Sequence, residues 1–165
     1  MITANLRGNV DTRLRKLDEG EYDAIVLAAA GLRRLGWQDR IRELIPVEIM
    51  CPAVGQGALA IQTREDSGPA QELVKRLNHP ASMIAVTAER ALLATLEGGC
   101  QVPVGGFARV DAGTVHLRAI VASPDGSRII RGERSGVDPA KIGVELGREL
   151  LDKGAREILR EVYAA

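Results

Sequence analysis

The stretch that decides the fold of this chain is residues 107–134, which read FARVDAGTVHLRAIVASPDGSRIIRGER. It holds three runs of apolar and β-branched residues, and each run is bounded by turn-forming residues, a pattern typical of strands. The predicted strands are Phe107–Asp111, Val115–Ala122 and Arg128–Arg134. Between them, Asp111-Ala112-Gly113 and Pro124-Asp125-Gly126 supply the Gly, Asp and Pro that tight turns need. The segment therefore predicts a three-stranded antiparallel meander.

Helices are expected on both sides of this meander. A helix over about residues 81–96 precedes it, with an apolar face that includes Met83 and Leu92, and Gly98-Gly99 is expected to end it. Two helices follow, over about 138–152 and 154–163, with Gly154 as the break. Together these elements predict a small α+β domain in which helices cover one face of the sheet.

The first fifty residues predict a different order of elements, helix, strand and helix, which is typical of α/β domains. A helix is expected over residues 9–19, with Asn9 as N-cap and Gly20 at its end. A buried strand is predicted over Tyr22–Ala29, because Ala24–Ala28 is continuously apolar, and Ala30–Leu35 is predicted to form a short helix. Because one helix–strand–helix unit cannot cover both faces of its strand, we interpret this region as part of an α/β domain.

The middle of the chain is expected to be irregular over residues 46–57, because prolines and glycines interrupt it. Ala58–Thr63 is predicted to form a short strand. A helix is then expected from Ser67, its predicted N-cap, to Leu77, with Pro69 in the first turn.

The composition excludes several classes of protein. Lys plus Arg and Asp plus Glu both number 22, and this zero net charge argues against binding nucleic acid through bulk charge. The longest apolar run, Ala24–Ala30, is too short to span a membrane. Two cysteines without an export signal indicate a reducing compartment, so a cytoplasmic location is expected.

Arginines and a glycine-bearing loop are the candidate ligand-binding features. Arg7 and Arg13 flank the start of the first predicted helix, where guanidinium groups could bind anions, although solvated surface arginines are the alternative. Arg33 and Arg34 follow the predicted strand, at the end where ligands gather in open α/β sheets. The loop Pro52–Ala58 lacks the Lys and Ser/Thr of a nucleotide P-loop, so it is either a polar ligand-binding loop around Gln56 or a hinge.

Cys100 is the strongest candidate for a residue that forms a covalent bond. It lies between Gly98-Gly99 and Gln101-Val102-Pro103, and we expect its thiol to be accessible. Because it follows the end of a helix and no histidine is tied to it, it is poorly placed as a turnover nucleophile but could be alkylated once. Cys51, His79 and His116 are interpreted as structural, and their spacing with Cys100 provides no metal-ligand pattern.

Seven segments in this order resemble the porphobilinogen deaminase (hydroxymethylbilane synthase) family, over about Leu6 to Tyr163. The segments are Leu6–Val10, Thr12–Leu14, Tyr22–Ala24, Ala30–Leu32 with Arg34, Pro52–Ala58, Ala88–Arg90 and Glu97–Pro103. The run Gly-Gly-Cys-Gln-Val-Pro is highly specific, and several ordered motifs together leave little room for chance.

The resemblance implies a transferase that joins four porphobilinogen molecules head to tail, with loss of ammonia at each step. It implies a dipyrromethane cofactor bound covalently as a thioether at Cys100. The residues of this chain that match the family's cofactor-binding positions are Arg7, Arg13, Arg34, Ala28, Gly31 and Gln56. A planar, always-charged guanidinium suits the acetate and propionate groups of each pyrrole.

The resemblance also implies three domains in a protein of roughly twice this length. Residues 1–51 match the second half of a periplasmic-binding-like α/β domain, 52–76 a segment returning to the first domain, and 77–165 the third, α+β domain. The N-terminal half, with the acid/base carboxylate, has no counterpart here. We therefore expect the chain to be inactive alone and to need that half as a complementing partner, and no catalytic carboxylate is assigned. The alternative is a non-catalytic α+β interaction module with a bare Cys100.

Overall fold

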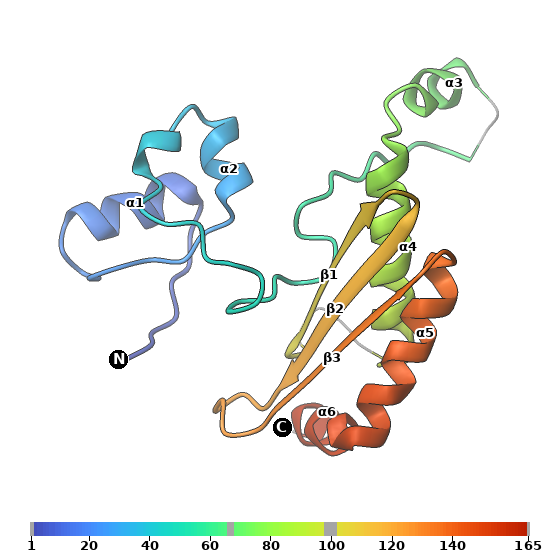
Figure 1. Cartoon of the computed structure of the whole chain (residues 1–165). Coiled ribbons are helices and arrows are strands. Elements are labelled where there is room, and N and C mark those ends of the chain that lie inside the picture. The colour runs from blue at the N-terminus through green and yellow to red at the C-terminus, as the bar shows by residue number, and fades with distance from the viewer. Residues whose placement is uncertain (1, 66–67, 98–101, 165) are drawn as a thin grey trace. The chain divides into compact units, whose positions relative to one another are not determined.

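The computed structural model describes residues 2–65, 68–97 and 102–164 of the chain (Figure 1). These residues form two compact units, Met1–Ile45 and Pro46–Ala165, which are described separately. No described helix is both long and apolar enough to cross a membrane.

The sheet of the second unit is the predicted meander. It consists of β1 (Val104–Asp111), β2 (Thr114–Ala122) and β3 (Ile129–Gly136), all antiparallel and in the order β1-β2-β3. β1 begins three residues before the prediction, since Val104 already pairs with Val121. In the β1–β2 turn, Ala112 and Gly113 have φ of 45° and 82°, the left-handed pair that a two-residue hairpin turn requires.

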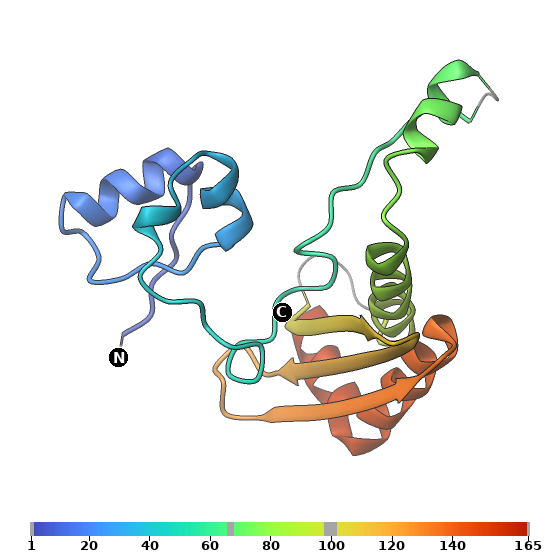
Figure 2. The same cartoon turned by 45° about the horizontal axis from the view of Figure 1, so that its top comes forward.

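Helices cover one face of this sheet, as predicted (Figure 2). They are α4 (Pro80–Thr95), α5 (Pro139–Leu150) and α6 (Arg156–Ala164). A wider helical turn, Leu151–Ala155, joins α5 to α6, and Gly154, with φ of 104°, is the predicted break. The α+β architecture expected for this part of the chain is confirmed.

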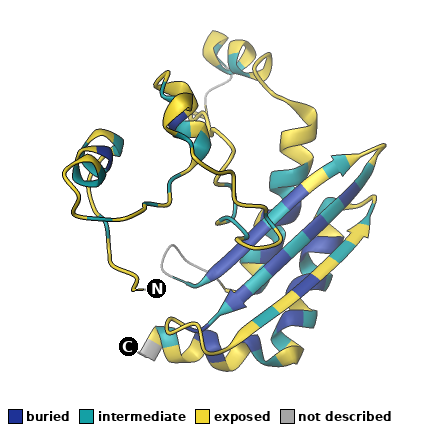
Figure 3. Cartoon of the chain, turned by 60° about the vertical axis from the view of Figure 1, so that its left-hand side comes forward, coloured by how far each residue is buried: buried dark blue, intermediate teal, exposed yellow. Residues whose placement is uncertain are grey.

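The hydrophobic core lies between β2 and these helices. Alternate residues of β2 are buried, which places Val115, Leu117, Ala119 and Val121 on the helix-covered face. Leu92 of α4 and Leu146 of α5 are fully buried against them. Figure 3 shows that the buried residues gather here, whereas in the first unit Leu14 and Leu32 are the buried hydrophobic residues among those described.

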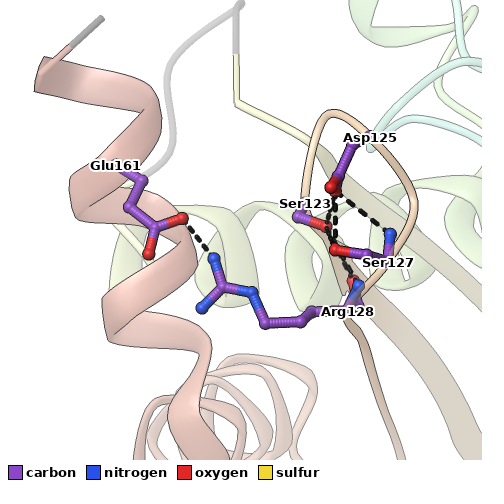
Figure 4. Close-up of polar contacts among 5 residues, drawn as sticks. All are labelled: Ser123, Asp125, Ser127, Arg128 and Glu161. Atoms are coloured by element: carbon purple, nitrogen blue, oxygen red, sulfur yellow. Dashed lines mark hydrogen bonds and ion pairs between the residues drawn. The ribbon is translucent and has the colours of Figure 1, made fainter.

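A polar network closes the β2–β3 turn (Figure 4). The buried Ser123 hydroxyl donates to the Asp125 carboxylate, which also accepts from the Ser127 amide at 3.1 Å and the Ser127 hydroxyl at 2.9 Å. The Arg128 amide donates to Ser123 Oγ at 3.0 Å. The Arg128 guanidinium pairs with Glu161, which ties the turn to α6.

This network predicts an acid-dependent loss of stability. The hydrogen bonds from Ser123 and Ser127 lower the pKa of Asp125 to about 2, from a usual 3.8. A lowered pKa means that the stabilisation is complete above the unfolded value and is lost as the pH falls toward the folded one. We expect Asp125→Asn to flatten the fall in melting temperature between those two pH values, as measured by circular dichroism. Asp152→Asn, at an exposed position, is the control and should retain the wild-type slope.

Two predictions for the middle of the chain are wrong. Ala58–Thr63 forms no strand in the structure, because no strand among the described residues offers it backbone hydrogen bonds. The following helix, α3 (Pro69–Lys75), has Gly68 rather than Ser67 as its N-cap, with Pro69 in the first turn as predicted. Ser67 and Gly98-Gly99, the expected end of α4, lie outside the described residues.

The first unit contains both predicted helices but not the predicted strand. The helices are α1 (Val10–Asp18) and α2 (Ala29–Arg34), followed by one 3₁₀ turn, Gln38–Arg40. Asn9 caps α1 as predicted, since its side chain accepts from the Thr12 amide at 2.9 Å. The predicted buried strand Tyr22–Ala29 is wrong: residues 22–28 have no strand partner, Ala29 already belongs to α2, and Val26 is 62% exposed. A strand needs a hydrogen-bonding neighbour, and the described residues of this unit supply none.

Candidate functional site

The start of α1 positions the first two candidate arginines. Gly8 has φ of 119°, and a Cβ there would come within 2.9 Å of the Thr12 side chain, so this turn requires glycine. Arg13 Nε donates to the Gly8 carbonyl at 2.8 Å, which fixes the half-buried Arg13 beside the turn. Arg7 immediately precedes the turn and is exposed.

The start of α2 brings together the next three candidates. Ala28 is the N-cap of α2, and its carbonyl accepts from the Gly31 amide at 3.0 Å. This bond occupies the Gly31 N–H, and the Gly31 carbonyl accepts from the Leu35 amide at 3.2 Å. These two residues can therefore offer a ligand the Ala28 N–H and the second lone pair of the Gly31 carbonyl. Arg34 lies in the last turn of α2 and is exposed.

The arginines of the first unit divide into those with acidic partners and those without, and among the described residues Arg33 and Arg42 have none. Arg15 pairs with Glu19 at 2.8 Å and Arg40 with Asp18 at 2.5 Å. Within the described residues, by contrast, no acidic side chain pairs with Arg7, Arg13 or Arg34. Their guanidinium charges are therefore left to bind carboxylate groups from outside this unit, and this donor set fits a ligand with several carboxylates.

The loop that carries Gln56 is attached to the sheet and to α4. Ala53 forms an isolated antiparallel bridge with Gly105, and the Gly106 amide donates to the Pro52 carbonyl at 2.9 Å. The Gly55 amide donates to Glu89 of α4 at 2.7 Å. Gln56 follows directly and is exposed. Glu89 is the residue that sequence reasoning missed, and the available signal was a carboxylate between Ala88 and Leu92 on the apolar face of a helix.

Cys100 lies outside the described residues, and so does Gln101. The described chain ends before it at Glu97, which has φ of 54° and whose carbonyl accepts a hydrogen bond from the Tyr163 hydroxyl of α6. It resumes at Val102, whose carbonyl accepts from the Val104 amide at 2.8 Å, where β1 begins. The Ala122 amide of β2 donates to the Pro103 carbonyl at 3.1 Å, so α6 holds the chain before this segment and β2 holds it after.

The residues interpreted as structural have structural partners. His79 is the N-cap of α4, and its Nδ1 accepts from the Ser82 amide at 3.3 Å. His116 Nδ1 lies 2.8 Å from the Ser135 hydroxyl on the neighbouring strand. Among the described residues, no three His, Cys, Asp or Glu side chains cluster as metal ligands would.

Cys51 is half-buried against β2, with its sulfur 4.0 Å from the Arg118 carbonyl. Burial raises the pKa of its thiol from 9.0 to about 11. Near pH 8 its reactive thiolate fraction should therefore be about 100-fold below that of an unburied thiol. In a Cys100→Ser background, we expect iodoacetamide to modify the folded chain correspondingly slowly, and the chain in urea at the unburied rate. Equal rates in the two states, measured by mass spectrometry, would contradict this assignment.

The comparison with known protein families covers both units. Residues 1–72 match the family model described as "Porphobilinogen deaminase, dipyromethane cofactor binding domain". Residues 83–152 match "Porphobilinogen deaminase, C-terminal domain". The first match contains all the candidate arginines and Gln56, and the second contains Cys100 and the whole sheet. Since the two models describe domains of one protein and together cover most of the chain, the chain belongs to the porphobilinogen deaminase family, a family of transferases of tetrapyrrole biosynthesis that carry a dipyrromethane cofactor.

Proposed function

We propose that this chain supplies the cofactor-attachment and carboxylate-binding parts of a hydroxymethylbilane synthase. The observation that carries the proposal is that one chain matches both the cofactor-binding and the C-terminal domain of the family, in order. The reaction is the stepwise condensation of four porphobilinogen units, with loss of ammonia at each step, into linear hydroxymethylbilane. When bound, the dipyrromethane provides the pyrrole to which the first unit is joined.

Cys100 is proposed to hold the cofactor through a thioether. This role requires an accessible sulfur that forms one durable bond, and it requires no neighbouring base for turnover. In support, the chain is held on both sides of residues 98–101, at Glu97 by the Tyr163 hydroxyl and at Pro103 by the Ala122 amide. Cys51 is a poor alternative, because burial raises the pKa of its thiol.

Arg7, Arg13 and Arg34 are proposed to bind the acetate and propionate groups of the cofactor and of the growing chain. Their support is the absence of acidic partners among the described residues, in contrast to Arg15 and Arg40, together with their positions in the matched segments, because Arg33 and Arg42 also lack such partners. Arg13 keeps its terminal nitrogens free for a carboxylate while its Nε holds the Gly8 carbonyl. The Ala28 N–H, the Gly31 carbonyl and Gln56 are proposed to add neutral polar contacts.

Turnover is proposed to need residues beyond these 165. Glu89 is the one buried carboxylate among the described residues, and both of its oxygens accept backbone hydrogen bonds. It is therefore not free to donate or accept a proton during ammonia release. We expect the purified chain alone not to convert porphobilinogen, and measurable formation of hydroxymethylbilane by it would contradict this part of the proposal.

We further propose that residues 1–51, 52–76 and 77–165 belong to the second, first and third domains of the assembled enzyme.

The test of the proposal is the intact mass of the chain, with peptide mapping around Cys100. We expect a dipyrrole-sized adduct on Cys100, either as purified or after incubation with porphobilinogen and the N-terminal half of a family member. Cys51→Ser should retain the adduct, and Cys100→Ser should abolish it. An unmodified Cys100 in both preparations would contradict the proposal and favour the non-catalytic module, for which the self-contained core of the second unit is the supporting observation.

A further inference from the structure

Glu89 is a charged residue in a position normally taken by an apolar one. It lies on α4 between Ala88 and Leu92, both fully buried, and its own exposed fraction is 6%. A buried carboxylate is destabilising unless its oxygens accept hydrogen bonds. Its presence therefore requires an explanation in its contacts.

The two oxygens of Glu89 join two segments that are distant in sequence. Oε2 accepts from the Gly55 amide at 2.7 Å, and Oε1 accepts from the Ala108 amide of β1 at 2.8 Å. Among the described residues, no lysine, arginine or histidine pairs with this carboxylate, so both of its contacts are backbone amides. Burial raises the pKa of Glu89, and the two backbone hydrogen bonds oppose that shift.

The Gly55 contact is the last of a series of anchors along the loop Pro52–Gly57. Pro52 and Ala53 are held on β1, and the Val54 side chain lies against Gly106, where an added Cβ would come within 2.9 Å of it. Gly55, with φ of 71°, then turns the chain so that its amide reaches α4. Beyond this point Leu59 is 86% exposed. Glu89 thus fixes the loop immediately before Gln56.

We propose that Glu89 is a positioning residue whose carboxylate holds the Pro52–Gly57 loop on β1 and α4 and so determines where Gln56 is presented to the ligand. The holding of the loop is independent of the enzyme's activity. The consequence for Gln56 rests on the proposed function.

Glu89→Gln in the full 165-residue chain tests the inference. Glutamine has nearly the same shape but only one acceptor oxygen, so its NH₂ group must face one of the two amides. Loss of one charge-assisted hydrogen bond should raise the exchange rate of the amides over residues 53–58 about tenfold or more. The amide protons of Gly55 and Ala108 should also lose the downfield shift that a carboxylate acceptor produces. Both are measured by NMR, which requires neither cofactor nor turnover.

Controls separate a local role from a general one. Glu72→Gln removes an exposed carboxylate that pairs with Lys75, and it should leave the loop unchanged. In Glu89→Gln, the amides of β2 should keep their wild-type protection from exchange. In Glu89→Asp, the amides over residues 53–58 should be less protected than in the wild type, because the shorter side chain does not reach both amides. Unchanged exchange over residues 53–58, or an equal loss across β2, would overturn the proposal. The presence or absence of an adduct on Cys100 affects the proposed function but not this result.

Discussion

Replacing Gly143 with alanine is expected to destabilise the second unit by about 3 kcal/mol and to lower its melting temperature by some 10 °C. Gly143 lies where α5 crosses α4 at close range. A Cβ at this position would come within 2.4 Å of the Ala88 carbonyl oxygen and 2.7 Å of the Ala91 Cβ. Neither is the end of a flexible side chain, so the helices must separate, and the separation exposes gaps around Leu92 and Leu146. Thermal and urea unfolding followed by circular dichroism measure the effect.

Gly31→Ala is the matched control for this substitution. Gly31 also lies in a helix, but an added Cβ there meets no atom within 4 Å. Alanine should therefore not lower the stability of the chain, and its higher helix propensity should stabilise α2 slightly. Gly147→Ala should act in the same direction as Gly143→Ala, because its added Cβ comes within 2.7 Å of Thr95. A melting temperature of Gly143→Ala equal to that of the wild type would show that α4 and α5 do not pack as described.

Hydrogen exchange is expected to differ by a factor on the order of 10⁴ between β2 and residues 24–28 of the first unit. Val115, Leu117, Ala119 and Val121 lie in the central strand and are at most 2% exposed, so their amides should open only with global unfolding. The amides over residues 24–28 have no strand partner and should exchange almost as fast as in an unfolded chain. NMR or mass spectrometry of the 165-residue chain measures both regions in one sample.

Dilution provides the control for the exchange measurement. Protection over residues 24–28 that appears at high protein concentration and disappears on dilution would indicate strand pairing between copies. Strong protection that does not depend on concentration would contradict the unpaired conformation. In either case β2 should keep its protection, because its two neighbours belong to the same chain.

Local sequence signals predicted much of the fold. The meander, its two turns and the flanking helices were predicted because alternation, turn residues and caps act over a few residues. Asn9 as N-cap of α1 and the break at Gly154 are of this kind. The strand Tyr22–Ala29 was predicted from the same sort of signal, but a buried strand also requires a neighbour, and an apolar run does not reveal whether one exists.

Sequence motifs predicted some residues of the candidate site, and only the structure revealed another. The motifs around Arg7, Arg13, Arg34, Gln56 and Cys100 pointed to the family that the comparisons confirm. They could not reveal Glu89 as an anchor, because its partners are amides of Gly55 and Ala108, which any residue type at those positions would offer.

The sequence by itself determined the family, the α+β architecture of the second unit and the residue types available for binding a polycarboxylate. Only the tertiary structure decided that Gly143 is a point of close helix contact, that Tyr22–Ala29 remains unpaired and that the Gln56 loop is held by a buried carboxylate. The physical reason for this difference is how far apart in the sequence the interacting residues lie. Propensity, capping and turn chemistry depend on neighbours along the chain, whereas packing, strand pairing and the burial of a charge depend on atoms brought together from distant positions.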